Sequence, residues 1–205
     1  CPQQAIAFNF SCIFTIHMKE QRTGTVINRH HWAAVRTTIR EYKKRFNGIN
    51  LAWIGDGFNV CNDLLIGCAK TGINISAACP LGYEPPEWIV KIAKREAVKT
   101  GSRIIVTNEP LSAVQDADLV VTDTFVSLGK DVEKIIREYI FIPKYQVNSE
   151  LMWHAKDDAI FMHCLPAKRD QEVTADVIDG KSSVIWKEAE NRLHVQKALL
   201  CLLMR

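Results

Sequence analysis

The strongest constraint on the fold is a regular alternation of short apolar runs with longer amphipathic segments, which begins near residue 34. Six apolar runs are predicted as strands, at residues 51–54, 73–78, 103–106, 118–121, 159–162 and 183–186. Helical spacing of apolar residues, or residues typical of helix ends, predicts helices at 34–46, 59–70, 86–99, 110–115, 131–139, 149–155 and 188–204. Strands that alternate with helices form parallel β-α-β units. We therefore predict an α/β fold with a doubly wound, mainly parallel sheet and helices on both faces.

Composition argues against several classes of protein. Hydrophobic residues make up 47% and charged residues 24%, which is ordinary for a globular domain. The longest apolar stretches, 117–121 and 198–204, are far shorter than the roughly 20 residues of a membrane helix, so no membrane partner is expected. The seven cysteines are scattered without C-x-x-C spacing, so we expect reduced thiols and no metal site. The expected location is cytoplasmic, with the mitochondrial matrix as the alternative.

The first 50 residues are strongly basic, with eight Lys or Arg against two Glu, although the whole chain has a net charge of only +3. Such a stretch can bind nucleic acid, or it can be a solvated helix face next to an unusual extension. The second interpretation is favoured, because neither interleaved aromatic residues nor an RNA-binding signature accompanies the charge. We expect an N-terminal extension at residues 1–33 and the α/β domain at 34–205.

Polar residues follow three of the predicted strands. Gly55-Asp56-Gly57 and then Asn59 follow the strand at 51–54, Asp123 follows 118–121, and His163-Cys164 follows 159–162. In parallel sheets, ligands bind beyond the carboxyl ends of the strands. We therefore expect these residues to meet at one edge of the sheet. A nucleotide cofactor is not expected, because the G-x-G-x-x-G fingerprint fails at Val60.

Each candidate residue also has a structural interpretation. Asn59 can donate its amide to a carboxylate at a helix start, where the glycines alone would indicate a plain turn. Asp123 can cap a loop, or with Ser127 it can bind an ammonium group. Cys164 can be inert packing or, less readily, a nucleophile. Arg192, next to Asn191, can be solvated surface or can present a fork to phosphate.

Taken together, the segments resemble the ornithine carbamoyltransferase family, from about Thr38 to the C-terminus. Residues 53–59 are similar to the family's W-I-G-D-G-N-N, and 80–85 to its P-x-G-Y-E-P. The loop at 122–129 matches T-D-x-W-x-S-M-G, and Tyr145–Asn148, His163–Pro166 and Glu188–Arg192 complete the series. The resemblance is to the ornithine-binding half of these aspartate/ornithine carbamoyltransferases. It implies a Rossmann-like ornithine-binding domain.

The resemblance also implies the activity and the site. The reaction would join carbamoyl phosphate and L-ornithine to give L-citrulline and phosphate, a step of arginine biosynthesis and the urea cycle, without a cofactor. Family homotrimers imply a homo-oligomer. Asp123, Cys164 and Arg192 would be catalytic, and Cys164, Leu165 and Arg192 would face carbamoyl phosphate. The residues that would contact ornithine are Asn59, Asp123, Ser127 and Leu128.

The sequence departs from the family pattern in places. Phe58, Phe125 and Leu128 replace the first Asn of N-N, the Trp and the Met of these motifs. The family's S-x-R-T phosphate loop is not found, and Asn28-Arg29-His30-His31 stands where H-P-x-Q is expected. Residues 1–33 would then be a divergent extension or a remnant of a missing carbamoyl phosphate domain. We expect a weakly active or inactive chain, with a non-catalytic amino-acid-binding or regulatory paralogue as the alternative.

Overall fold

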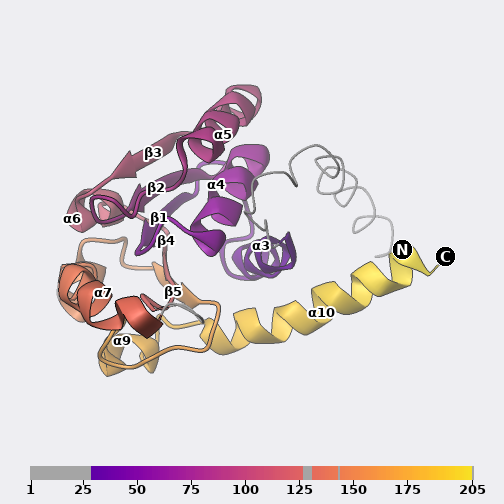
Figure 1. Cartoon of the computed structure of the whole chain (residues 1–205). Coiled ribbons are helices and arrows are strands. Elements are labelled where there is room, and N and C mark those ends of the chain that lie inside the picture. Colours follow the sequence, from indigo (N-terminus) through magenta and orange to yellow (C-terminus); the bar gives the residue numbers. More distant parts are fainter. Residues whose placement is uncertain (1–28, 127–130, 143, 205) are drawn as a thin grey trace.

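A five-stranded parallel sheet lies at the centre of the computed structural model, which describes residues 29–126, 131–142 and 144–204 (Figure 1). The strands run in the order β3-β2-β1-β4-β5, and every pair is parallel. Their bounds are β1 (Asn50–Ile54), β2 (Asn74–Ala78), β3 (Ile104–Thr107), β4 (Leu119–Thr122) and β5 (Ile160–His163). From β1 the chain builds the sheet first to one side, through β2 and β3, and then to the other side, through β4 and β5, as in doubly wound folds.

Alternate residues of β1, β2, β4 and β5 contribute to two separate apolar clusters. Leu51 and Trp53 of β1 belong to the cluster on one face, whereas Ala52 and Ile54 belong to the cluster on the other. All four side chains are buried. A strand that is covered on both faces has no polar side, which explains why the strands read as continuous apolar runs.

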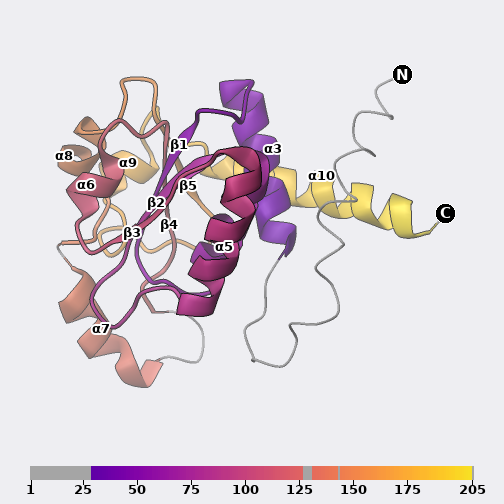
Figure 2. The same ribbon diagram turned by 90° about the horizontal axis from the view of Figure 1, so that it is seen from above.

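Helices cover both faces of the sheet (Figures 1 and 2). The helices of the first face are α3 (Arg29–Lys43), α4 (Asn59–Thr71) and α5 (Glu87–Thr100). Those of the second face are α6 (Pro110–Val114), α7 (Lys134–Phe141, after the short 3-10 helix η2, Asp131–Glu133), α8 (Ser149–Trp153) and α9 (Ala175–Ile178). Together with the parallel sheet, they confirm the predicted doubly wound α/β fold.

The last helix, α10 (Ile185–Leu203), packs against α3 and β5 near its start and then extends away from the body of the domain (Figure 1). The Asn191 amide on α10 donates to Thr38 Oγ1 at 2.9 Å and to Glu41 Oε2 at 2.8 Å, both on α3. Within the described part of the chain, no helix is long and apolar enough to cross a membrane.

Helices α3 and α4 approach each other closely at Gly67. A Cβ atom at this position would lie 2.1 Å from the ring of Trp32, which is buried. Only a residue without a side chain allows the indole of α3 to rest on the backbone of α4. This contact anchors α3, and α3 in turn carries the residues that hold α10.

Several predicted helix ends are confirmed. α4 and α5 stop at Gly72 and Gly101, whose φ angles of 79° and 76° are left-handed. α8 begins after Asn148, and the Asn148 side chain accepts a hydrogen bond from the backbone N–H of Leu151. These helix-end signals depend only on neighbouring residues, so they can be predicted from the sequence alone.

The predicted sixth strand at 183–186 is wrong. Ser183 forms only an isolated bridge with Phe161, and α10 already begins at Ile185. A four-residue apolar run is too short for its periodicity to separate a strand from the start of a helix. Helix α3 begins at Arg29, before the predicted helix start at residue 34.

Candidate functional site

A pocket of about 210 Å³ lies where β1, β4 and β5 end. β1 and β4 are sheet neighbours, but the chain leaves them for opposite halves of the sheet, so their following loops diverge and leave space between them. The pocket is lined by His31, Trp53, Asp56, Phe58, Asn59, Val60, Asp123, Thr124, Cys164, Leu165 and Arg192.

The loop after β1 is held by a close contact between backbones. The N–H of Gly57 donates to the carbonyl of Tyr83 at 2.8 Å, and a Cβ atom on Gly57 would lie 2.2 Å from the nitrogen of Pro85. Glycine is therefore required here. The contact joins the 80–85 segment to the start of α4, where Asn59 reaches the pocket.

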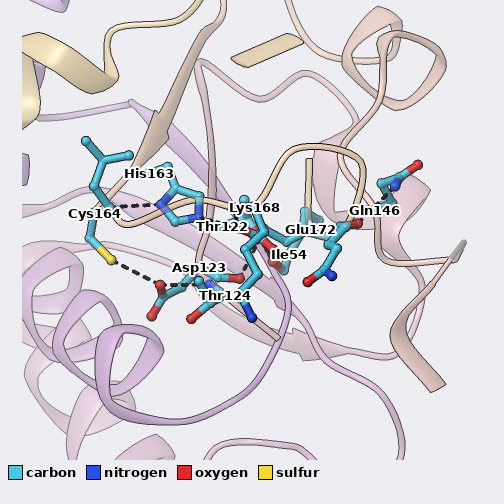
Figure 3. A network of polar contacts seen from close by, with 11 residues as sticks. Ile54, Thr122, Asp123, Thr124, Gln146, His163, Cys164, Lys168 and Glu172 are labelled. Carbon is cyan, nitrogen blue, oxygen red and sulfur yellow. Dashed lines mark hydrogen bonds and ion pairs between the residues drawn. The ribbon is translucent and has the colours of Figure 1, made fainter. Parts of the chain in front are cut away.

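Asp123 and Cys164 form a direct hydrogen bond across the pocket. The Cys164 Sγ donates to Asp123 Oδ1 at 3.1 Å, and the N–H of Thr124 donates to the same oxygen at 2.8 Å (Figure 3). Among the described residues, the other carboxylate oxygen of Asp123 has no hydrogen-bond partner. Asp123 therefore combines its expected role in shaping the loop with an oxygen that a ligand can use.

Burial raises the pKa of the Cys164 thiol well above its ordinary value, and the neighbouring Asp123 carboxylate raises this pKa further. The thiol consequently stays protonated at neutral pH and acts as a hydrogen-bond donor. Nucleophilic catalysis requires the thiolate, so this environment opposes that interpretation of Cys164.

Arg192 enters the pocket from α10. Its Nη1 donates to the carbonyl of Cys164 at 3.1 Å, which fixes the guanidinium beside the thiol. The adjacent Asn191 faces α3 instead and is buried there. Of these two neighbours, only Arg192 can present its donors to a bound anion.

The structure thus brings together five of the seven residues predicted for the site: Asn59, Asp123, Cys164, Leu165 and Arg192. The other two, Ser127 and Leu128, lie outside the described residues.

Several residues of the site carried no recognised signal in the sequence. Arg137 on α7 donates from Nη1 to Asp56 Oδ2 at 2.7 Å and to the Phe125 carbonyl at 3.0 Å. It thereby ties the loop after β1 to the loop after β4. An arginine in an amphipathic helix has no local feature that would reveal such a role.

His31 lines the pocket, although sequence reasoning did not single it out for the site. Its Nε2 lies 3.3 Å from Glu188 Oε1, and both side chains are buried. His31 belongs to the segment that stands in place of H-P-x-Q, so the departure from the family motif lies at the pocket itself.

Asp123, His163 and Cys164 have potential metal-ligand atoms within 4.8 Å of one another. However, His163 Nδ1 accepts the N–H of Leu165, and His163 Nε2 lies against Glu172. Because both ring nitrogens are engaged, we propose no metal ion at this cluster.

The fold and the pocket together define a class of protein: a doubly wound α/β domain whose pocket offers both a carboxylate and a guanidinium. The family model "Aspartate/ornithine carbamoyltransferase, Asp/Orn binding domain" matches residues 47–203. The chain therefore belongs to the aspartate/ornithine carbamoyltransferase family, as its motifs indicated.

Individual relatives agree with this assignment. The chain is 52% identical over 167 residues to the ornithine carbamoyltransferase of Carboxydothermus hydrogenoformans, covering 82% of this chain and 53% of the relative. The Bacillus subtilis ornithine carbamoyltransferase is 50% identical over 163 residues, or 80% of this chain and 51% of the relative. The solved Pyrococcus furiosus ornithine carbamoyltransferase superimposes with a TM-score of 0.81 at 45% identity, covering 85% and 55% of the two chains. This chain spans about half the length of these relatives.

Proposed function

We propose that this chain is the ornithine-binding half of an ornithine carbamoyltransferase, which makes L-citrulline and phosphate from L-ornithine and carbamoyl phosphate. The observation that carries the proposal is the meeting of Asn59, Asp123, Cys164 and Arg192 at one pocket. These residues come from four separate segments of the chain. The names of the relatives support the choice of ornithine as the amino acid.

Asp123 and Cys164 are suited to orient the side-chain amine of ornithine. The thiol donates to one oxygen of Asp123, so the other oxygen can accept an N–H from the amine. A neutral amine held in this way keeps its lone pair for attack on the carbamoyl carbon. The amide of Asn59, at the start of α4, can bind the α-carboxylate of the amino acid. Such catalysis rests mainly on positioning.

Arg192 is suited to the phosphate of carbamoyl phosphate, because a guanidinium presents several donors in one plane. Its position next to the Cys164 carbonyl would bring the phosphate close to the bound amine. We propose that Cys164 and Leu165 face the same substrate. A dianionic phosphate needs several fixed donors, so Arg192 alone is expected to give weak binding.

The binding test is calorimetry with L-ornithine, and with L-norvaline, which lacks the side-chain amine. Asp123→Asn should weaken ornithine binding about 10- to 100-fold, because hydrogen bonds to charged groups contribute roughly 1.5–3 kcal/mol. Norvaline binding should change much less. Asp116→Asn is the matched control, because Asp116 lies beside the opposite end of β1, where its carbonyl accepts from Asn50. Equal losses for the two ligands would contradict the assigned role of Asp123.

The activity test is citrulline formation by the purified chain with both substrates. We expect little or no turnover, because Arg192 lacks the further phosphate donors of the family motifs. Robust citrulline production would overturn that expectation. Ornithine binding without turnover would favour the alternative, a non-catalytic amino-acid-binding or regulatory paralogue. Phe58 and His31, at pocket positions where the family motifs have amides, favour this alternative.

We further propose a cytoplasmic location and assembly into a homo-oligomer. The location is supported by the free state of all the described cysteines and by the bacterial and archaeal origin of the relatives. The oligomer is supported by the trimers of the family that the chain resembles.

A further inference from the structure

His163 and Glu172 form a buried pair that the proposed reaction does not use directly. His163 Nε2 lies 3.2 Å from Glu172 Oε1, and both side chains have an exposed fraction of 0%. The same glutamate oxygen accepts the backbone N–H of Lys168 at 2.6 Å. In the view of Figure 3, the His163 ring lies between Cys164 and Glu172.

The hydrogen bonds of the pair define the protonation of the imidazole. His163 Nδ1 accepts the backbone N–H of Leu165 at 2.9 Å, so Nδ1 carries no proton. The proton of a neutral ring must then lie on Nε2, where it is donated to Glu172. The glutamate thereby selects the one tautomer that leaves Nδ1 free to accept.

The bond from Leu165 to His163 holds an unusual stretch of backbone. Leu165 has a left-handed φ of 55°, which is uncommon for a residue with a branched side chain. Cys164 comes directly before Leu165, and the turn directs the Cys164 thiol to Asp123 and the Cys164 carbonyl to Arg192. Both groups of the proposed site therefore depend on the shape of one turn.

Stability alone does not explain the pair. Among the described residues, Glu172 Oε2 is buried and has no hydrogen-bond partner. A buried carboxylate that is only partly satisfied costs free energy, and well-packed apolar residues often replace such pairs at no loss of stability. A role in fixing geometry accounts for this buried polar pair.

We propose that His163 and Glu172 are positioning residues for the amine-binding site: Glu172 fixes the imidazole tautomer, and the imidazole fixes the turn that places Cys164 against Asp123 and Arg192. The amine-binding role of the site in this inference rests on the proposed function. The contacts of the turn itself can be tested without any substrate.

The first test compares His163→Leu with His163→Asn by mass-spectrometric mapping of thiol alkylation. Leucine removes the acceptor for Leu165, whereas the asparagine oxygen can replace Nδ1. Alkylation of Cys164 should rise on the order of 10-fold in His163→Leu, because a thiol that moves away from Asp123 loses the burial and the neighbouring carboxylate that raise its pKa. His163→Asn should stay close to the wild type, and Glu172→Leu should resemble His163→Leu.

Cys61, Cys68 and Cys79 serve as internal controls, because all three are fully buried and report any general loss of the fold. A selective rise at Cys164 supports the proposal. Unchanged Cys164 labelling in a folded His163→Leu chain overturns it.

The second test uses the wild-type chain, so it decides the matter even if a variant does not fold. Long-range ¹H–¹⁵N correlation of the His163 ring at neutral pH should show a protonated Nε2 and a bare Nδ1. A proton on Nδ1 would overturn the proposal. Neither test involves ornithine, so a failure of the proposed function would appear separately, as absent ornithine binding in calorimetry.

Discussion

Single residues near the site are held in one protonation state by their surroundings. The Cys164 thiol remains a donor because its pKa is raised by burial and by Asp123. Tyr145 is held in the same way near the ends of β2 and β3. Its hydroxyl donates to the carbonyl of Asn108 at 2.7 Å and lies 3.2 Å from that of Cys79. Both groups must stay protonated to keep these contacts.

Tyr145 gives a pH dependence with a defined sign. Burial chiefly raises its pKa from 10 to about 12. The folded chain therefore retains this proton more tightly than the unfolded chain does. The resulting stability is fully present below pH 10 and is lost between pH 10 and 12, at up to about 1.4 kcal/mol per pH unit.

We expect Tyr145→Phe to lower the free energy of unfolding by about 1–2 kcal/mol at pH 7, because it removes the donor from a buried carbonyl. The gap from the wild type should shrink as the pH rises above 10. Urea unfolding at pH 7, 10 and 11 measures both effects. Tyr42→Phe, at an exposed tyrosine, is the control. A gap that stays constant with pH would contradict the assignment.

At the scale of elements, the sequence could predict what local patterns encode. The five strands and the glycine-ended helices depend on neighbouring residues, so short windows of sequence contain them. The prediction of a strand at 183–186 failed because the same four residues suit a strand or the start of a helix. The packing of α10 against α3 decides between the two. Helix α9 was not predicted, because four residues show no periodicity.

The site could be predicted only in part, for a related reason. Motifs at strand ends pointed to Asn59, Asp123 and Cys164, because parallel strands bring their carboxyl ends to one edge. In contrast, the contact of Arg137 with Asp56 joins residues far apart in the sequence. No local pattern records such a contact.

The close packing of α3 on α4 gives a prediction that reverses the usual rule. A glycine-to-alanine change inside a helix normally stabilises by roughly 0.5–1 kcal/mol. At Gly67 the new Cβ would meet the ring of Trp32, and overpacking of this kind costs about 1–3 kcal/mol. Gly67→Ala should therefore destabilise the chain and change the fluorescence of Trp32. Thermal unfolding measures the first effect, and a higher melting temperature would refute the prediction.

At the scale of the whole molecule, the two apolar clusters share the same strands. Trp53 belongs to one cluster and its neighbour Ile54 to the other, so neither face can separate from the sheet without exposing the other. We expect one cooperative unfolding transition. Tryptophan fluorescence, whose buried reporters Trp32 and Trp53 both lie in the first cluster, and far-UV circular dichroism should give the same urea midpoint. Two separated midpoints would show that one face unfolds independently.

The order of the strands also determines when the pocket can form during synthesis. The middle strand β1 pairs with β4, with Leu51 opposite Leu119. This side of the sheet therefore cannot form until residues much later in the sequence have been made. Arg192 is made later still, on α10. The pocket therefore stays incomplete during synthesis until α10 has left the ribosome, and a ligand can stabilise only a domain in which α10 is in place.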